Sequence, residues 1–260
     1  MTVEPIPARG PGEVAWPGDL RTTWLIARRG AIESLRDHLT QGVSVVFSLA
    51  IPLFIVMMVV RPLVRQSGAE GAGAVGTVIA SYLLIVGLMP SSGSIGIAAG
   101  MFAGEKEQGS LLPLLASPAS NRAIFAGKVL GAVIPALLYA ALADTTYLAE
   151  IWLVLGARTL RLLPLALSIA LMALVPANAV LGATVASLVS SRVRTYQTAQ
   201  MLSGLAVFPV SGILIGLAIQ MQRWSSAYLF VAVAVLVALD ALLLVISAAT
   251  WRREEVMARR

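Results

Sequence analysis

The chain has 260 residues, of which 58% are hydrophobic and 12% charged, with a net charge of +6 and no cysteine. Soluble domains have about 25% charged and 45–50% apolar residues, so this composition excludes a soluble globule and indicates an all-α integral membrane protein with one membrane domain. The absence of cysteine excludes disulfides and thiol catalysis. Contact of basic residues with anionic lipid headgroups explains the positive net charge better than nucleic-acid binding does, because no basic stripe is interleaved with aromatic residues.

Residues 1–19 combine four prolines with three glycines, a composition that predicts a disordered cytoplasmic tail rather than a signal peptide. Residues 20–41 differ, because apolar residues recur there at steps of three and four, which predicts one stripe on a helix. The stripe consists of Leu20, Trp24, Ala27, Ala31, Leu35 and Leu39. Arginines occupy the other faces, so we expect a basic amphipathic helix that lies in the membrane interface.

Six apolar segments follow, each close to or longer than the roughly 20 residues that cross a bilayer as a helix. They are Val43–Val60, Thr77–Ala103, Val129–Leu155, Leu162–Ser190, Gln197–Gln220 and Ser226–Trp251. The fifth contains Pro209 and Gly212, which leaves open a shorter span followed by a re-entrant hairpin. The pattern therefore predicts six transmembrane helices, of which the fifth is the least regular.

The distribution of basic residues predicts the orientation of these helices. With the N-terminus in the cytoplasm, the segments on the inside hold 14 of the 19 Lys and Arg residues, and those on the outside hold 5. An odd number of spans would move the basic C-terminal cluster to the outside, so the asymmetry supports an even number. We expect both termini in the cytoplasm, in the plasma membrane of a prokaryote.

The polar segment Gly104–Lys128 lies between the second and third spans and carries the strongest functional signal in the chain. Glu105 and Glu107 flank a lysine at the point where the second span ends. Leu111, Leu112, Leu114 and Leu115 follow, too few for a span and too apolar for a solvated loop. Ser120 is placed to cap a helix that runs into the third span. Such a segment docks on a partner or lies in the interface as an ordinary turn, and the pattern alone fits both.

This segment resembles the signature of type-2 ABC transporter permeases without a gap. The residues in register are Glu105, Glu107, Gly109, Leu111, Leu114, Leu115, Pro118, Ser120, Ile124, Gly127 and Lys128. Ser110 replaces a threonine, Leu112 replaces a common acidic residue, Pro113 is unusual, and the arginine comes one place late as Arg122. The amphipathic helix, the six spans and a Ser211–Gly212 break are similar to the family's architecture, over about residues 20–255.

The resemblance implies the type-2 ABC exporter fold and the role of a permease subunit in an ATP-driven exporter. Residues 20–260 would form the transmembrane domain, with 20–41 as the connecting helix and 104–128 as the coupling-helix segment. Glu105 and Glu107 would orient that segment, Leu114 and Leu115 would fill a groove of the ATPase, and Gly109 would allow a tight turn. Two permease subunits, identical or different, would associate with two ATP-binding subunits, which hold ATP and Mg. The permease itself needs no cofactor.

The chain has no phosphate-binding loop of its own, so the ATPase is expected to be a separate polypeptide. Gly127 and Lys128 match the end of such a loop, but Val129 follows them and Arg122 stands where the first glycine is required. We therefore expect Gly127 to allow close packing of the third span, and we expect no catalytic residue in this chain.

Two other classes of function remain as alternatives. An ion-coupled carrier or channel would use Asp144 and Asp240, which are costly inside a membrane and so need a reason. Asp144, Thr145 and Asp240 could line a substrate pathway, one suited to an amphipathic or cationic substrate. Structural pairing explains Asp144 equally well and Asp240 better. An intramembrane enzyme is the least favoured class, because His38 is the single histidine and no metal-binding set exists.

Overall fold

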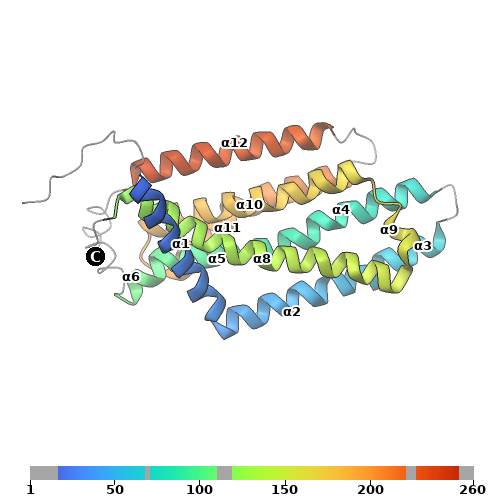
Figure 1. Cartoon of the computed structure of the whole chain (residues 1–260), viewed down its shortest axis with the longest axis horizontal. Helices are drawn as coiled ribbons and strands as arrows, with labels where there is room; N and C mark the ends of the chain where they lie inside the picture. The colour runs from blue at the N-terminus through green and yellow to red at the C-terminus, as the bar shows by residue number, and fades with distance from the viewer. Residues whose placement is uncertain (1–16, 68–70, 110–118, 221–226, 252–260) are drawn as a thin grey trace, which may run out of the picture.

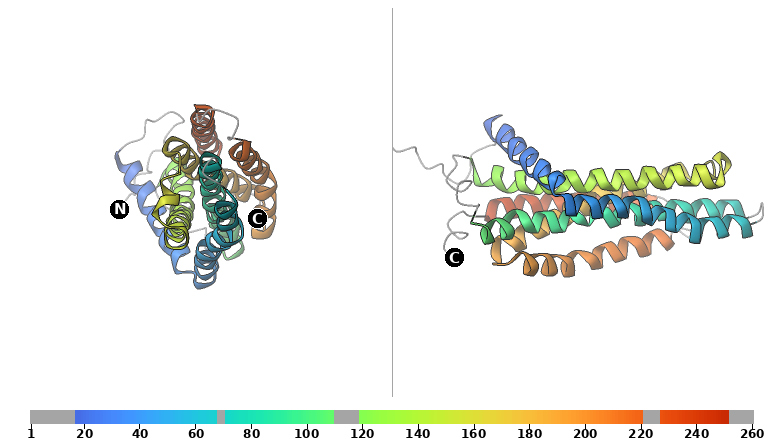
Figure 2. Two further views of the ribbon diagram at one scale, coloured as in Figure 1. Left: turned by 90° about the vertical axis from the view of Figure 1, so that its right-hand side faces the viewer. Right: turned by 90° about the horizontal axis from the view of Figure 1, so that it is seen from below.

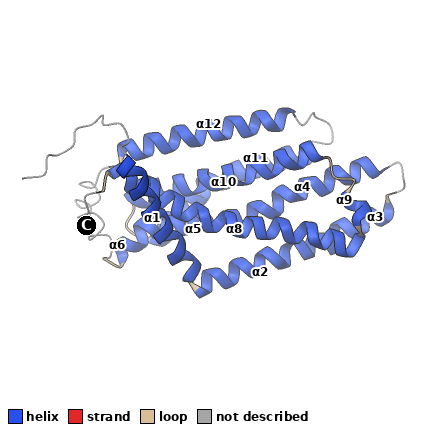
Figure 3. Ribbon diagram, in the orientation of Figure 1, coloured by secondary structure: helices blue, strands red, loops and turns tan. Residues whose placement is uncertain are grey.

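The computed structural model describes residues 17–67, 71–109, 119–220 and 227–251. In these ranges the chain is helical, with short connections and no strand (Figure 3). The helices are α1 (Pro17–Arg36), α2 (His38–Ile55), α3 (Arg61–Gln66), α4 (Ala72–Ser91), α5 (Gly93–Ala99), α6 (Glu105–Glu107), α8 (Asn121–Leu155), α9 (Ala157–Leu160), α10 (Leu165–Arg192), α11 (Tyr196–Gln220) and α12 (Ala227–Thr250). Two π-helical turns, η1 (Val56–Val60) and η3 (Gly100–Gly104), join α2 to α3 and α5 to α6.

Six helical segments in the described structure are long and apolar enough to cross a membrane, which confirms the predicted number. They are Gln41–Gln66, Ala72–Glu107, Asn121–Leu155, Leu165–Arg192, Tyr196–Gln220 and Ala227–Thr250. The segments run side by side along the long axis of the molecule (Figure 1). The beginning of α1 and the end of α12 lie at the same end of this bundle, as an even number of spans requires. We call it the α6 end, and the opposite end, which carries α3 and α9, the α9 end.

The third span, α8, is the centre of the bundle. It packs against α1, α2, α4, α5, α10 and α12. Its large side chains Ile124, Phe125 and Tyr147 are fully buried. In contrast, the outer helices α2, α11 and α12 keep many large apolar side chains exposed, for example Phe54, Leu205 and Val245. An apolar outer face around a packed interior is the arrangement expected of a bundle whose surroundings are lipid.

The predicted helix over residues 20–41 is divided in two by the structure. α1 ends at Arg36, Asp37 is outside both helices, and α2 begins at His38, so Leu39 belongs to α2, the helix that leads into the first span. α1 is inclined to the bundle and crosses α8 near the α6 end (Figures 1 and 2). The predicted apolar stripe divides as well. Ala27 and Ala31 are buried, whereas Leu20 and Trp24 are 69% and 57% exposed.

The crossing of α1 over α8 depends on glycine. A Cβ atom on Gly127 would lie 2.8 Å from the Cβ of Ile26 and 2.9 Å from the carbonyl oxygen of Thr23. One turn further along α8, a Cβ on Gly131 would lie 3.1 Å from the carbonyl oxygen of Ala27. Small residues let helix backbones approach closely, as is common in membrane proteins. The expectation that Gly127 allows close packing is confirmed, and the partner is α1.

The fifth span is one continuous helix, so the reading as a shorter span with a re-entrant hairpin is wrong. α11 runs from Tyr196 to Gln220 without interruption, with Pro209 inside it. Figure 2 shows it as a single curved helix along the side of the bundle. Proline is tolerated in membrane helices because neighbouring groups satisfy the carbonyl that it leaves unpaired. Gly212 has no atom near enough to meet a Cβ, so it marks neither a break nor a close approach.

Candidate functional site

The second span ends in a π-helical turn, η3, beside which the buried side chain of Lys128 lies. In η3 the N–H of Glu105 donates to the carbonyl of Gly100, five residues earlier, as well as to that of Phe102. Such turns are rare and often mark functional positions. Beside this turn, the ammonium group of Lys128 donates to the carbonyl of Met101. The irregular backbone thus supplies a hydrogen-bond acceptor to a charge that enters from α8.

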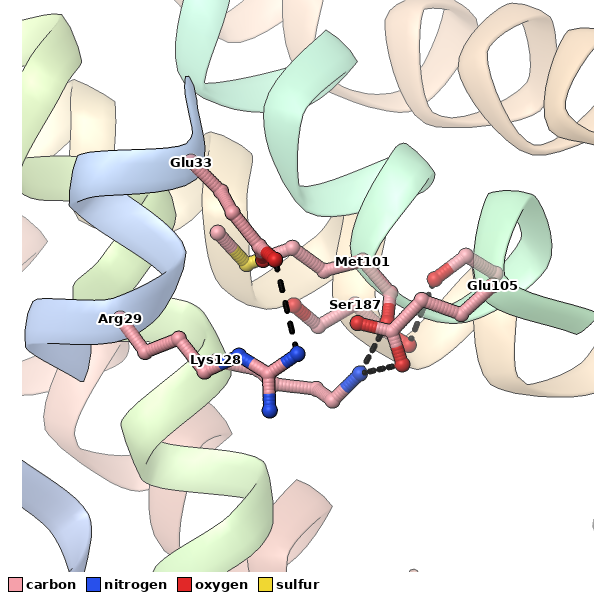
Figure 4. Close-up of polar contacts among 7 residues, drawn as sticks. Arg29, Glu33, Met101, Glu105, Lys128 and Ser187 are labelled. Atoms are coloured by element: carbon pink, nitrogen blue, oxygen red, sulfur yellow. Dashed lines mark hydrogen bonds and ion pairs between the residues drawn. The ribbon is translucent and has the colours of Figure 1, made fainter. Parts of the chain in front are cut away.

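Lys128 is 3% exposed, and three neighbouring groups compensate its charge, of which Figure 4 shows the carboxylate of Glu105 and the carbonyl of Met101. Its Nζ lies 2.6 Å from Oε2 of Glu105 and 4.7 Å from the centroid of the Phe102 ring. The carbonyl of Met101 is the third partner. A buried charge is tolerated when it is paired and hydrogen-bonded, and an aromatic face adds a favourable cation–π contact. Glu105 and Lys128 therefore join the end of the second span to the beginning of the third.

The next residue, Lys106, binds the end of a different helix. Its Nζ lies 2.6 Å from the carbonyl oxygen of Ser191, 3.3 Å from that of Val193 and 3.4 Å from that of Ser190. These carbonyls belong to the C-terminus of α10, where the last backbone acceptors lack partners inside the helix. A cation at this position is favoured both by hydrogen bonding and by the helix dipole. Lys106 thus fixes α6 to α10.

Glu107 binds the beginning of α11. Its Oε1 accepts a hydrogen bond from the backbone N–H of Tyr196 at 3.1 Å. Tyr196 is the first residue of α11, where the N–H groups are free of intrahelical partners and a carboxylate is favoured. Three successive residues therefore contact α8, α10 and α11 in turn. We call Glu105, Lys106 and Glu107, with Lys128, the clamp.

Five of the nine predicted docking residues lie in the described part of the chain, in the clamp or, as Gly109 and Ser120 do, beside it. Glu105, Glu107 and Lys128 are brought together by it, whereas Leu111, Leu114, Leu115 and Pro118 lie outside the described residues. No contact of Lys106 was predicted, because nothing in the neighbouring residues of the chain indicates that α10 ends beside it. Since Glu105 and Lys128 are in contact, the two ends of the segment between the second and third spans are held together at its base.

The turn and the cap predicted on either side of this segment are confirmed. Gly109 has a φ of +69°, a conformation that glycine adopts without strain, and its N–H donates to the carbonyl of Lys106 at 3.1 Å. Ser120 accepts a hydrogen bond at its Oγ from the N–H of Ala123, also at 3.1 Å, and so caps α8. The chain leaves α6 and enters α8 with defined geometry.

A second ion pair lies next to the clamp on α1. Arg29 and Glu33 face the region of Lys128 in Figure 4, and their nitrogen and oxygen atoms are 3.5 Å apart. Their side chains are 79% and 63% exposed, so solvent weakens this pair strongly. The two pairs offer a contrast of a buried and an exposed charge within one small region.

The residues of the predicted substrate pathway are not brought together. Asp144 is buried on α8, and its carboxylate oxygens lie 3.1 and 3.3 Å from the position that a Cβ of Gly87 on α4 would take. Thr145 is exposed on another face of α8, and its hydroxyl donates to the carbonyl of Ala141 at 2.7 Å. Because successive helical residues are about 100° apart, the two side chains point in different directions.

Asp240 is also separate from Asp144. It is 5% exposed on α12, eleven residues before Trp251, a rise of about 16 Å. The ring of Trp251 packs on that of Phe125, 6.5 Å between centroids, and Asp144 comes nineteen residues after Phe125, about 28 Å along α8. The two acids thus differ by about 12 Å in depth. Oδ1 of each has no hydrogen-bond partner in the described structure, so the pairing favoured for Asp240 and considered for Asp144 is not found there.

Neither metal-binding side chains in the described structure nor similarity to other proteins identifies the function. No group of three or more His, Cys, Asp or Glu side chains that could hold a metal ion occurs in the described ranges. Comparison of the sequence with protein-family models and with curated proteins finds no match. The contacts made by this chain's own residues are therefore the basis on which its function is inferred.

Proposed function

We propose that this chain is the permease subunit of an ATP-driven exporter with the type-2 ABC exporter fold, and that residues 104–128 dock on a separate cassette ATPase. The observation that supports this proposal is the clamp, because its members anchor that segment to three helices of the bundle. Glu105 and Lys128 join the ends of the segment, Lys106 binds the end of α10, and Glu107 binds the beginning of α11.

A docking segment transmits movement only if its base is fixed to the helices that must move. Coupling between distant sites is carried by packed contacts and hydrogen-bonded networks with more than one discrete arrangement. Glu105, Lys106 and Glu107 link α6 to three different helices, so a displacement imposed between residues 108 and 120 would be passed to α8, α10 and α11 together. A simple interfacial turn has no need of such contacts.

α1 is proposed as the connecting helix, lying in the interface between the membrane and the cytoplasm. It is inclined to the bundle, and it exposes Leu20 and Trp24 beside the exposed arginines Arg21 and Arg28. An amphipathic surface with basic and large apolar side chains binds anionic headgroups while burying its apolar part at shallow depth. This position would bring α1 alongside the docked ATPase.

The same transporter fold implies a subunit composition and an orientation in the membrane. Two permease subunits, identical or different, would work with two ATPase subunits that hold ATP and Mg, because this chain has no phosphate-binding loop. The excess of basic residues on one side supports cytoplasmic termini in a prokaryotic plasma membrane, with the α6 end facing the ATPase.

The proposal is tested by co-purification with a cassette ATPase, most simply one encoded beside this chain. We expect a stable complex in which the permease alters ATP turnover, and we expect both properties to be lost when residues 110–117 are scrambled. Scrambling Ala157–Leu160 at the α9 end is the matched control and should change neither. Complex formation that survives the first scramble, or an ATPase that never binds, would contradict the docking assignment.

A second variant separates docking from transmission. Lys106→Met removes the link to α10 without altering residues 110–117, so we expect the ATPase to bind while its turnover no longer responds to the permease. Normal coupling in this variant would show that the clamp is not the transmitting element. Transport by the permease alone, driven by an ion gradient in vesicles without ATP, would favour the carrier alternative.

A further inference from the structure

α1 lies against the backbone of α8 on both sides of Lys128. A Cβ on Gly127, one residue before the lysine, would lie 2.9 Å from the carbonyl oxygen of Thr23. A Cβ on Gly131, three residues after it, would lie 3.1 Å from the carbonyl oxygen of Ala27. Residues four apart share one face of a helix, so the two glycines form a continuous surface on which α1 packs. The buried lysine therefore lies directly beside the contact between α1 and α8.

Met101 connects this contact to the clamp. Its terminal methyl carbon, Cε, lies 2.7 Å from the position that a Cβ of Gly30 on α1 would take, and 3.2 Å from that of Gly131 on α8. The side chain thus fills the junction of α1, α8 and η3. The carbonyl of the same residue accepts the hydrogen bond from Lys128. Met101 therefore contacts α1 with its side chain and the buried ammonium group with its backbone.

α1 also separates exposed charges from the buried one. Arg29 and Glu33 on α1 lie close enough for their charges to act on Lys128, and Figure 4 shows α1 passing beside the lysine. Both of these side chains are exposed, whereas Lys128 is buried. The boundary between exposed and buried charge at the α6 end thus follows α1.

The attachment of α1 to the bundle depends on small side chains. Among its described side chains only Ala27 and Ala31 are buried, whereas Leu20 and Trp24 face outward. Displacement of α1 would therefore expose little apolar side-chain area, and elements with few buried apolar contacts open most readily. Dispersion contacts between closely packed backbones lose a quarter to a half of their energy when a gap of about 0.5–1 Å opens. The contacts that hold α1 are thus short in range and would be lost together.

The ion pair beside α1 depends on the exclusion of water. The attraction between two charges increases as the effective dielectric constant falls, and a solvent-exposed pair contributes little. With α1 in place, Lys128 is 3% exposed and lies 2.6 Å from Glu105. A displaced α1 would admit water to the ammonium group and would free the side chain of Met101 from Gly30. The link between the second and third spans would then weaken.

We propose that α1 is a movable cover of the clamp, which strengthens the pair of Glu105 and Lys128 when it is packed on α8 and weakens the pair when it is displaced. As a statement about this chain alone, the inference needs no partner. As a statement about regulation, it rests on the proposed function, in which α1 lies alongside the docked ATPase. The position of α1 would then control the transmission of movement through residues 104–128.

The chain has two lysines, Lys106 and Lys128, and both belong to the clamp, so an amine-reactive reagent reports on it directly. The experiments follow acetylation of each lysine by sulfosuccinimidyl acetate in the purified full-length chain in lipid nanodiscs, with mass spectrometry as the readout. Lys128 should react only while α1 is displaced. Lys106, which binds the end of α10, is the internal control.

The first experiment locks α1 in place with a disulfide. The chain has no cysteine of its own. The Cβ of Ile26 lies 2.8 Å from the Cβ position of residue 127, within about 1 Å of the separation found in disulfides, so Ile26→Cys with Gly127→Cys supplies the pair. We expect oxidation to slow acetylation of Lys128 by about tenfold or more, and reduction of the same protein to restore it. Ile26→Cys alone should not respond to the oxidant. Equal rates in the oxidised and reduced pair would overturn the inference.

The second experiment displaces α1. Ala27→Leu places a large side chain in the contact with α8, whereas Arg28→Leu places the same side chain at the adjacent exposed position. We expect Lys128 to be acetylated faster by about tenfold or more in the first variant and within about twofold of wild type in the second. An unchanged rate at Lys128 in Ala27→Leu, or an equal rise at Lys106 and Lys128, would contradict a cover specific to Lys128.

The regulatory role is tested last, in the complex with the ATPase. We expect the oxidised cysteine pair to bind the ATPase without altering its turnover, and reduction to restore the response, because transmission requires two arrangements of the clamp. A response that persists in the oxidised protein would overturn the regulatory role. An ATPase that binds no form of this chain would instead contradict the docking proposal, and the acetylation results would stand without it.

Discussion

At the α6 end, Glu105, Lys106, Glu107 and Lys128 each meet a group on another helix, whereas Asp144 in the interior of the bundle meets none in the described structure. Both regions contain a buried ionisable side chain: Lys128 in the clamp, where Glu105 and Lys106 are half-buried and Glu107 is exposed, and Asp144 in the interior. In the clamp the cost of burial is offset by ion pairs and by the free ends of helices. Asp144 carries its cost without such compensation, which natural proteins tolerate mainly at functional sites. Mutations should therefore have opposite consequences in the two regions.

The largest loss of stability is expected from Lys128→Met. This change leaves the carboxylate of Glu105 and the carbonyl of Met101 without their common donor. Removal of one partner from a fully buried ion pair costs about 3–5 kcal/mol, and because the side chain of Glu105 is 29% exposed we expect a loss near the lower end, about 3 kcal/mol. Chemical unfolding in mixed micelles, followed by tryptophan fluorescence, would measure the free energy of unfolding.

Two controls decide whether the loss comes from the orphaned charge. Arg29→Met breaks the exposed pair with Glu33 and should change stability by less than about 0.5 kcal/mol. Lys128→Met combined with Glu105→Leu replaces both charges by apolar groups and should be more stable than Lys128→Met alone, because no unpaired carboxylate remains. If the double variant is the weaker one, the clamp depends on packing rather than on charge.

A smaller loss is expected from Gly127→Ala, which tests the contact that holds α1 beside the clamp. The added methyl group would press on the side chain of Ile26 and the carbonyl of Thr23, and overpacking of this kind costs about 1–3 kcal/mol. Gly212→Ala, which meets nothing within 4 Å, should instead be neutral or stabilising by up to about 1 kcal/mol. Protection of α1 against proteolysis would report the same difference locally.

Ser120→Ala should cost about 1 kcal/mol, since it removes the cap from the N–H of Ala123. Ser120→Asp supplies an equivalent acceptor and should restore the stability of the wild type. Unfolding curves of the three proteins give the comparison, and an alanine variant as stable as the aspartate variant would show that the cap is not needed.

Asp144→Asn is expected to have the smallest effect on stability and the opposite sign. Because the carboxyl group has no partner to lose, removal of its charge should leave the free energy of unfolding unchanged or raise it by about 1 kcal/mol. The same unfolding assay, compared with Lys128→Met, tests the contrast between the two regions directly. A loss of stability as large as that of Lys128→Met would mean that Asp144 is paired. Both regions would then hold ionisable side chains with partners, and the contrast would fail.

Features that depend on neighbouring residues in the chain could be predicted from the sequence. The six apolar helices follow from composition over about 20 residues, and the cap at Ser120 follows from the residues just after it. The close approach at Gly127 was also predictable, although its partner was not. In each case the determining signal lies within a few turns of the residue concerned.

Features that depend on the packing of distant segments were missed. The contact of Lys106 with Ser191 joins residues 85 positions apart, and only the relative placement of α6 and α10 determines it. The outward direction of Thr145 likewise depends on which face of α8 meets α4 and α10. The change of direction at Asp37 has no signal in the sequence, because the apolar spacing continues through this residue. In the structure the chain passes there from a helix that crosses α8 to a helix that runs along it.

The π-helical turn η3 gives the clamp a dependence on chain length. A chain shorter by one residue between Gly100 and Gly104 would continue as ordinary α-helix, which would turn α6 by about 100° and draw it back by about 1.5 Å. Glu105, Lys106 and Glu107 would then all leave their partners at once, although none of them had been replaced. The alignment of α8, α10 and α11 with the second span is thus set by the number of residues that precede the charges as much as by the charges themselves.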